Sequence, residues 1–354
     1  MILERVESFI SQFKKYFIKN KDGFYELPYL ANSPESLIQG IRKMPFIKHA
    51  QKDKVFYSNT PFIKTEIHFQ KLERGLWVIY AESQNKANLL FNRIVDKELL
   101  SDYFILGLEI STTQTTFKNS PSNKFSYSNY TCHLYKPESK AMHCRFKDTT
   151  VFTLNIFFDR TWLANVLHKE SFFTNSNVSR FLESDTKELT WPVSQALMKP
   201  VYYPLTNNIK NKIEGTDPVI LKEQTLAFIE WFIRLCDQGK SRESFFQLPD
   251  YDKKAILSAE NYLTKNLNAP FPGINVLSRH VGISPTKLKN DFKMVFGETI
   301  FQYFRQKQME LAFHLIRYER KSVRDVARQM GYSNITKFFI AFKKHLGVLP
   351  TSIT

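Results

Sequence analysis

The stretch Leu277-Ser278-Arg279-His280-Val281-Gly282-Ile283-Ser284 decides the fold of the last third of the chain, because its pattern returns as Val326-Ala327-Arg328-Gln329-Met330-Gly331-Tyr332-Ser333. In each copy a short helix is expected to end at the glycine, which can take a left-handed conformation without a Cβ clash. One apolar residue follows, and the serine after it can cap a second helix. Each copy therefore predicts a helix, a tight turn and another helix.

The second helix of each copy has one apolar face at helical spacing. The residues of that face are Leu288, Phe292 and Val295 in the first copy, and Phe338 and Phe342 in the second. The outer face is basic, and an amphipathic helix over about 299–318 joins the copies. Helix, turn, helix with a basic outer face is typical of a DNA reader, and two in tandem are far more specific than one.

The spacing of the glycines shows how closely the copies match. Gly282 and Gly331 lie 49 residues apart, and the glycines that end the second helices, Gly297 and Gly347, lie 50 apart. The two copies therefore differ by one inserted residue.

The positive charge is concentrated in the same region. The chain has 50 Lys and Arg against 34 Asp and Glu, which gives a formal charge of +16 and a pI near 9.5. Residues 251–354 contain 17 basic and 7 acidic residues, whereas residues 1–250 contain 33 and 27. A basic C-terminal third indicates an anionic partner, either nucleic acid or a membrane surface, although a solvated lysine-rich surface explains the charge about as well.

Length and composition exclude several classes of protein. A chain of 354 residues is more than one small core usually fills, so two domains are expected. Sparse Gly (11) and Pro (15) exclude collagen-like and low-complexity chains. No apolar run reaches the roughly 18 residues of a membrane span, acidic residues near Met1 argue against an export signal, and three cysteines fit a reducing compartment. We therefore expect a cytoplasmic protein without a membrane span.

The first 250 residues change from strand patterns to helix patterns. Alternating or apolar runs predict strands over 65–69, 76–80, 103–110, 128–135 and 151–158. The polar stretch 111–129 is expected to be a long loop, and strands without intervening helices indicate an antiparallel sandwich or barrel. Helices are expected after Asp159. The helix from Pro218 to about Asp237 is apolar over more than one face, so it contacts either a dimer partner or its own domain.

Together these patterns predict an α+β protein. A β-rich N-terminal domain with helices is expected over 1–238, a linker over 239–250, and an all-α tandem helix-turn-helix domain over 251–354. The linker contains Gly239 and Pro249 and precedes the rise in net charge.

Residues 251–350 resemble the DNA-binding domain of the AraC/XylS family of transcription regulators, nearest the branch that includes siderophore-uptake regulators. Beyond the repeat, the resemblance rests on Phe-Gly-Glu-Thr-Ile-Phe-Gln-Tyr-Phe (296–304), Ala312, Leu315-Ile316 and Gly347-Val-Leu-Pro350. It implies a seven-helix domain that places two recognition helices in successive major grooves on one face of a duplex.

The resemblance also implies what the N-terminal domain does and what the chain binds. That domain is expected to be cupin-like or otherwise β-rich, and to sense an effector and form a homodimer. The implied partners are double-stranded DNA, a small-molecule effector and a second copy of the chain, with RNA polymerase as a further candidate. The implied function is sequence-specific regulation of transcription under effector control, dimer control or both.

The resemblance assigns DNA contacts position by position. The implied base-reading residues are Thr286, Lys289 and Asn290 in the first recognition helix, and Asn334, Ile335, Thr336 and Ile340 in the second. The implied phosphate contacts are Lys287, Lys293, Lys337, Lys343 and Lys344. Lysine can hydrogen-bond guanine O6 and N7, and asparagine can bind adenine through two hydrogen bonds. The alternative is that these polar side chains only face solvent.

Several positions depart from the family pattern. Ile340 stands where Arg is frequent and, with Phe339, makes the second recognition helix unusually apolar. We infer that this helix reads thymine methyl groups and positions the protein, while the first helix makes most of the base discrimination. Gln308 replaces a usual Arg in the joining helix, which leaves open how firmly the two halves are locked together.

The sharpest competing signal is Cys132-His133 with His143-Cys144. On facing strands of one hairpin, their sulfur and nitrogen atoms could ligate a metal. Alternation sends the members of each pair to opposite faces, which favours a half-buried hairpin without metal. The alternative function is a cupin-type metal-binding enzyme with an appended DNA-binding domain. The sequence has no phosphate-binding loop or hydrolase motif, so we assign no catalytic residue, metal or cofactor.

Aromatic residues of the N-terminal region are candidates for an effector pocket. They are Trp77, Tyr80, Phe104, Phe157, Phe158 and Trp162. An aromatic core is the commoner explanation of such a set, and both interpretations stay open.

Overall fold

The structure is a computed structural model that describes residues 18–19, 23–44, 46–50, 54–96, 102–117, 120–169, 176–192, 202–208, 218–238 and 248–353. The chain divides into two compact units. The N-terminal unit comprises residues 1–112 with 128–243, and the C-terminal unit comprises residues 113–127 with 244–354. The sequence does not anticipate the assignment of residues 113–127 to the C-terminal unit.

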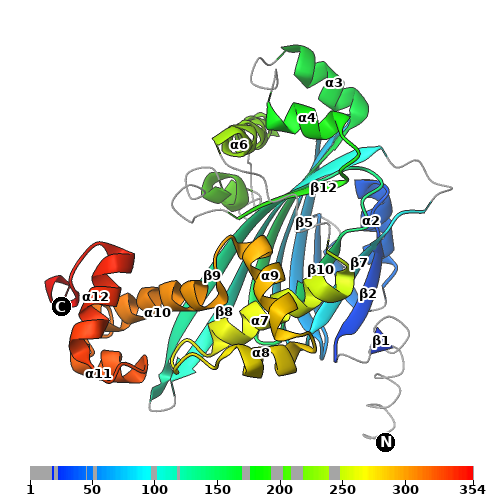
Figure 1. Ribbon diagram of the computed structural model, residues 1–354. Coiled ribbons are helices and arrows are strands. Elements are labelled where there is room, and N and C mark those ends of the chain that lie inside the picture. The colour runs from blue at the N-terminus through cyan, green and yellow to red at the C-terminus, as the bar shows by residue number, and fades with distance from the viewer. Residues whose placement is uncertain are drawn as a thin grey trace, which may run out of the picture. The chain divides into compact units, whose positions relative to one another are not determined.

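An eight-stranded sheet forms the body of the N-terminal unit (Figure 1). Its strands in spatial order are β12 (Glu188–Pro192), β9 (Ser120–Tyr135), β8 (Tyr103–Phe117), β11 (Thr149–Asp159), β6 (Leu76–Asn85), β5 (Ile63–Glu73), β4 (Val55–Asn59) and β3 (Ile47–Ala50). Strands β3 to β6 form an antiparallel meander, and β11 returns to pair antiparallel with β6. The β-rich N-terminal region of the predicted α+β fold is therefore confirmed.

A second, four-stranded sheet lies in the same unit. Its strands in spatial order are β1 (Ile18–Lys19), β2 (Tyr25–Leu30), β7 (Leu89–Ile94) and β10 (Met142–Arg145). Strands β2 and β7 are parallel, whereas β10 pairs antiparallel with β7 and places His143 opposite Phe91. Because β6 and β7 are separated by only a few residues, the chain passes directly from the large sheet to the small one.

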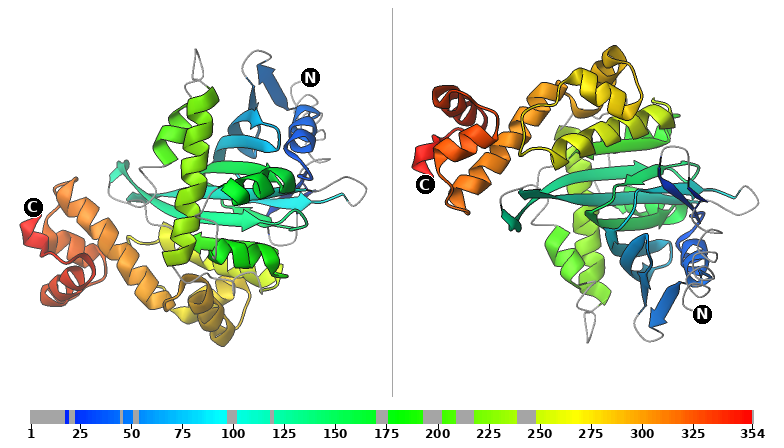
Figure 2. Two further views of the ribbon diagram at one scale, coloured as in Figure 1. Left: turned by 90° about the horizontal axis from the view of Figure 1, so that it is seen from above. Right: turned by 90° about the horizontal axis from the view of Figure 1, so that it is seen from below.

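Side chains alternate along each strand, so the large sheet has two buried faces. Val78 of β6 packs in a core with Phe232 of α6 (Pro218–Gln238), which crosses that face (Figure 2). The helices α3 (Arg160–Lys169) and α4 (Asn177–Glu183) join the same core. Ile79, the next residue of β6, packs instead with Ile38 of α2 (Pro34–Arg42) on the other face.

The expectation of a long loop over 111–129 is wrong. Strand β8 runs to Phe117 and β9 starts at Ser120, so most of this polar stretch is extended backbone. Threonine is β-branched at Cβ and favours strands even where no apolar alternation announces one. The polar composition of residues 111–129 therefore led to the wrong prediction of a loop.

Residues 248–353 fold into six α-helices and one short 3-10 helix. These are α7 (Asp250–Lys265), α8 (Ile274–Val281), α9 (Pro285–Phe296), α10 (Ile300–Arg317), α11 (Val323–Gln329), α12 (Ile335–Leu346) and η3 (Pro350–Ser352). Phe292 of α9 and Phe342 of α12 are both fully buried in one cluster, together with Leu311 and Leu315 of α10. The two predicted helix-turn-helix copies are present, and they share a single hydrophobic core.

Candidate functional site

A glycine and a serine fix the turn of the first copy. Gly282 has φ +75°, and its N–H donates to the Ser278 carbonyl at 2.9 Å, which ends α8. The Ser284 hydroxyl accepts a hydrogen bond from the Lys287 N–H at 3.3 Å, and Pro285 occupies the first position of α9. A left-handed residue followed directly by an N-cap reverses the chain over a few residues. This is the turn that the sequence predicts.

The second copy has a longer turn. Gly331 is also left-handed, with φ +81°, but the residue that caps α12 is Asn334, so the expected cap at Ser333 is wrong. The Asn334 side-chain oxygen accepts from the N–H groups of Thr336 at 2.7 Å and Lys337 at 3.4 Å. The one residue by which the copies differ therefore lies in this turn. Serine and asparagine are about equally good caps, so the sequence could not choose between adjacent ones.

The outward face of α9 carries side chains that can form hydrogen bonds with base edges. Thr286, Lys289 and Asn290 are all exposed, and Lys293 follows one turn further along the same face. Residues four apart on a helix share a face, so Thr286, Asn290 and Lys289 form one polar surface opposite the buried Phe292. This surface can donate to and accept from base edges.

The outward face of α12 is different in chemistry. Two exposed residues of this helix are apolar: Ile335, at its first position, is 42% exposed, and Ile340, near its middle, is 65% exposed. Thr336, Lys337, Lys343 and Lys344 are exposed around them. Exposed isoleucines among basic side chains distinguish this outward face from that of α9, whose exposed residues named above are polar.

Two of the implied DNA contacts make other contacts inside the C-terminal unit. The Lys287 ammonium lies 3.0 Å from the carboxylates of both Asp291 and Asp252, which are nearly buried. Hydrogen bonds to Asp291 and Asp252 raise the pKa of Lys287. The Tyr251 hydroxyl also donates to the Gly282 carbonyl at 3.2 Å. Lys287 therefore ties α9 to the start of α7 in this structure, and its implied phosphate contact stays a prediction.

The capping role of Asn334 likewise bears on its implied DNA contact. Its side-chain oxygen already accepts two backbone N–H groups, which the start of α12 leaves without helical partners. A bidentate contact to adenine needs that same oxygen. Asn334 therefore caps α12 in this structure, and its implied role in base reading stays a prediction that would compete with the cap.

Gln308 locks the two copies together, although it stands where the family has Arg. It is fully buried, and its amide nitrogen donates to the carbonyls of Leu267 at 3.0 Å and Ala269 at 2.7 Å. Its amide oxygen accepts from the Arg305 guanidinium at 2.9 Å. That guanidinium lies 4.7 Å from the ring centre of Tyr332, in the second turn. The Gln308 amide on α10 thus binds the loop after α7. Arg305, which donates to Gln308 and stacks on Tyr332, connects this contact to the second copy.

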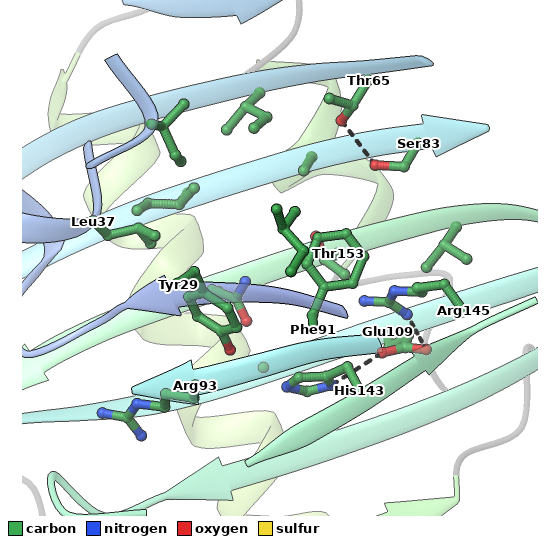
Figure 3. Close-up of a pocket in the computed structure, with 18 of the residues that line it drawn as sticks. Tyr29, Leu37, Thr65, Ser83, Phe91, Arg93, Glu109, His143, Arg145 and Thr153 are labelled. Atoms are coloured by element: carbon green, nitrogen blue, oxygen red, sulfur yellow. Dashed lines mark hydrogen bonds and ion pairs between the residues drawn. The ribbon is translucent and has the colours of Figure 1, made fainter. Parts of the chain in front are cut away.

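A cavity of about 200 Å³ lies between the two sheets and α2 in the N-terminal unit (Figure 3). Its wall is mostly apolar, with Leu37, Ile79 and Phe91 among the lining residues. The polar lining residues are Tyr29, Ser58, Thr65, Ser83, Asn85, Arg93, Glu109, His133, Tyr135, His143, Arg145, Thr153 and Asn155. A mostly apolar pocket with convergent polar groups is the usual form of a small-ligand site.

Glu109 is the centre of the polar wall. It forms an ion pair with Arg145, and its other carboxylate oxygen lies 3.7 Å from the His143 ring nitrogen (Figure 3). Burial acts to raise the pKa of Glu109, but Arg145 and His143 outweigh it and lower the pKa to about 2. Burial lowers the pKa of His133 to about 3. At neutral pH the Glu109–Arg145 pair is therefore ionised and His133 is neutral.

Of the aromatic residues predicted for a pocket, Phe157 lines this cavity. Tyr80, Phe104, Phe158 and Trp162 lie in the core on the opposite face of the large sheet, against α6. Trp77 packs beside Phe157 without lining the cavity. The difference follows from alternation, since adjacent residues such as Phe157 and Phe158 must face opposite sides.

Sequence reasoning missed Tyr29, Arg93, Glu109 and Arg145, which supply the polar chemistry of this cavity. The available signal was a charge inside an apolar run, as in Leu106-Gly107-Leu108-Glu109-Ile110. A charged side chain is almost never fully buried unless it is paired. Such a run therefore indicates a partner on another strand, but it does not say which one.

The cysteine and histidine pairs lie on different sheets and not on one hairpin, which corrects that expectation. His133 of β9 and His143 of β10 both line the cavity, with ring centres 5.9 Å apart. Cys132 is buried in the core on the opposite face of the large sheet, as the alternation predicts. Within the described ranges, no group of three or more His, Cys, Asp or Glu has an arrangement that would hold a metal ion.

Comparisons with known proteins match the C-terminal region. A family model described as a helix-turn-helix domain matches residues 277–354. The HTH-type transcriptional activator RhaR of Salmonella heidelberg (strain SL476) is 23% identical over 146 residues, which cover 41% of this chain and 50% of RhaR. The chain thus spans about half the length of the curated relatives it matches. A second model, described as an olfactomedin-like domain, matches residues 37–125 but ends inside β9, so it delimits no structural unit.

Solved structures show the same regional likeness. The C-terminal domain of the two-component response regulator yesN from Fusobacterium nucleatum is 26% identical and covers 28% of this chain and 97% of its own, with a TM-score of 0.27. The DNA-binding domain of AdpA, solved with a target DNA, is 18% identical and covers 28% of this chain and 87% of its own, with a TM-score of 0.26.

Two capped helix pairs around one core define a tandem helix-turn-helix domain. The family model described as a helix-turn-helix domain agrees with this architecture, and the curated relatives that the chain matches in part are transcriptional activators. Across the described residues, no helix is both long enough and apolar enough to span a bilayer.

Proposed function

We propose that the protein is a sequence-specific DNA-binding regulator of transcription. The observation that carries the proposal is the pair of capped helices α9 and α12, which direct exposed side chains outward from one shared core. The excess of basic residues over 251–354 supports it, because lysine and arginine neutralise phosphates and release counterions.

In this proposal α9 reads sequence through hydrogen bonds. Lys289 and Asn290 contact base edges in the major groove and Thr286 adds a hydroxyl, while Lys293 contacts a phosphate. Each good base contact contributes about 1–3 kcal/mol of discrimination. The Lys287 link to α7 holds α9 in place for these contacts.

The second helix reads sequence by apolar contact. Ile335 and Ile340 are exposed on α12, and the thymine methyl group is the apolar feature of the major groove. Thr336 lies between them in this surface, and Lys337, Lys343 and Lys344 contact phosphates. The two recognition helices are proposed to enter successive major grooves, one helical turn of DNA apart.

The N-terminal unit is proposed to control this engagement. A small-molecule effector would bind in the cavity between the sheets, and a second copy of the chain would associate through this unit. Val219 and Ile220 of α6 support such an association, because they are 58% and 46% exposed. We further propose a cytoplasmic location, RNA polymerase as a partner at the promoter, and no enzymatic activity.

A selection from random duplex DNA tests the function. The full chain should enrich one motif with two half-sites, and failure to enrich any motif would contradict sequence-specific binding. Thymine should then be replaced by uracil, which lacks only the methyl group, at each position of the motif. We expect a several-fold loss of affinity at thymines in the α12 half-site, and Ile340→Ala should remove that loss. Lys289→Ala is the matched control and should leave the uracil effect unchanged.

A further inference from the structure

We propose that the cavity of the N-terminal unit binds a small organic anion: one carboxylate on an apolar body of about six to ten non-hydrogen atoms. This inference rests on the proposed function, because it names the chemical class of the effector. It is drawn from the charges, the unpartnered polar atoms and the size of the cavity.

The charges on the cavity wall do not balance. Glu109 is paired with Arg145, which leaves Arg93 as an additional cation of the wall. Arg93 is only 4% exposed, and none of the described carboxylates lies within 4 Å of its guanidinium. Glu188 and Glu138 act on it only from longer range. Buried charges are normally paired, so the cavity has a positive charge that a bound anion would neutralise.

The contacts of Arg93 hold its guanidinium without neutralising it. One terminal nitrogen donates to the Lys136 carbonyl at 3.3 Å, and the other donates to the carbonyls of Ala31 and Pro137 at 3.1 Å each. The Arg93 Nε is buried and has no hydrogen-bond partner. Carbonyl groups are dipoles without net charge. The guanidinium is thus preorganised, with its Nε–H and one terminal N–H unused, and a carboxylate can accept from such donors.

Two phenols of the cavity wall are the proposed partners of Arg93 in a carboxylate site. Tyr29 and Tyr135 both line the cavity, and both interact electrostatically with Arg93; Tyr29 lies beside it in Figure 3. Burial raises the pKa of both tyrosines, so their hydroxyls stay protonated and can donate hydrogen bonds. On other strands of the wall, the Ser58 hydroxyl and the Asn85 amide oxygen are buried without partners. Unsatisfied buried polar atoms at one cavity indicate a polar ligand.

The rest of the wall selects an apolar body of limited size. Leu37, Phe91 and Phe157 are among the residues that line it. An engineered apolar cavity of about 150 Å³ in another protein holds benzene, so a space of about 200 Å³ accommodates a ring or short chain together with a carboxylate.

Isothermal titration of the full chain with matched acids and amides tests the proposal. Benzoate and hexanoate carry the charge, and benzamide and hexanamide have nearly the same size without it. We expect both acids to bind at least tenfold more tightly than their amides. Tyr29→Phe and Tyr135→Phe should weaken benzoate binding several-fold, whereas Tyr57→Phe should not, because Tyr57 of β4 lies outside the cavity wall and is 41% exposed.

The outcomes separate this inference from the proposed function. Equal binding of acids and amides, or no binding of either acid at millimolar concentration, would overturn the anion site. Affinity for the selected DNA motif is measured on the same samples, and its loss would contradict the regulator function instead. Arg93 is left unchanged, since its replacement would also break three hydrogen bonds to the backbone. Thermal unfolding of the tyrosine variants verifies that they fold.

Discussion

The two helix-turn-helix copies have the same interior and different outer faces. Phe292 and Phe342 occupy equivalent buried positions, and both second helices end at a left-handed glycine. Outward, α9 offers Lys289 and Asn290, whereas α12 offers the exposed Ile340. The core and the caps restrict inward residues to a few types, whereas the outward residues named here are exposed and not restricted in that way. If the proposed function holds, the specificity of each copy lies in its outer face.

The copies are also not independent. They share one core, and Gln308 holds the loop that contains Leu267 and Ala269 while it accepts a hydrogen bond from Arg305. The backbone of Gly331 also lies close to Pro270, since a Cβ at position 331 would be only 3.0 Å from the Pro270 ring. In the proposed function, a rigid pair of recognition helices would fix the spacing between DNA half-sites, so differences between the copies would act within one geometry.

The largest predicted effect is on the free energy of unfolding, and it tests whether the buried residues of the two copies are equivalent. Phe292→Ala and Phe342→Ala should each lower the free energy of unfolding of the C-terminal unit by about 3–5 kcal/mol, because each leaves a cavity in the same core. Urea unfolding followed by circular dichroism measures this. Ile340→Ala is the matched surface control and should change stability by less than about 0.5 kcal/mol. Two separate transitions for the two halves would contradict a shared core.

The sequence predicts the buried side of both helix-turn-helix copies well. The spacing of apolar residues, the helix caps and the terminal glycines all depend on residues that are close together in the sequence. The helices of both copies and their buried faces are therefore predicted from residues such as Leu288 and Phe338. The residue before α12 was misassigned, since Ser333 and Asn334 are both good caps. The Gln308 amide donates to the Leu267 carbonyl about 40 residues earlier in the chain. A contact between such distant residues cannot be predicted from a local sequence pattern.

The N-terminal unit was less predictable, again for physical reasons. Strand alternation indicates which residues share a face but not which sheet a strand joins. For that reason β9 and β10 were expected on one hairpin, although they lie in different sheets. The cavity depends on Arg93 and Glu109, and their burial is explained only by partners distant in the chain.

A second prediction compares the two asparagines. Asn290→Ala should reduce affinity for the selected motif by about 1–3 kcal/mol and leave stability unchanged, because Asn290 is exposed and proposed to contact a base. Asn334→Ala should instead lower the free energy of unfolding by about 0.5–2 kcal/mol, because it removes the cap of α12. Urea unfolding and fluorescence anisotropy on one set of variants measure both.

The matched control for this pair is Asn334→Ser. Serine can cap a helix but cannot form the bidentate contact with adenine, so stability should recover and affinity should match that of the unmodified chain. If Asn334→Ser restored stability but still lost specificity at one base, Asn334 would read DNA as well as cap the helix.

The smallest expected effect separates two lysines on the same helix. Lys293→Met should reduce the slope of log affinity against log salt concentration by about one, because one phosphate contact is lost. Lys287→Met should leave that slope unchanged and lower the midpoint of urea unfolding, because it leaves Asp252 and Asp291 without their cation. Lys343→Met, on α12, should match Lys293→Met. An equal loss of slope in Lys287→Met would mean that this lysine leaves its carboxylates when DNA binds. The ion pair between Lys287 of α9 and Asp252 of α7 would then exist only in the DNA-free domain and would break when DNA binds.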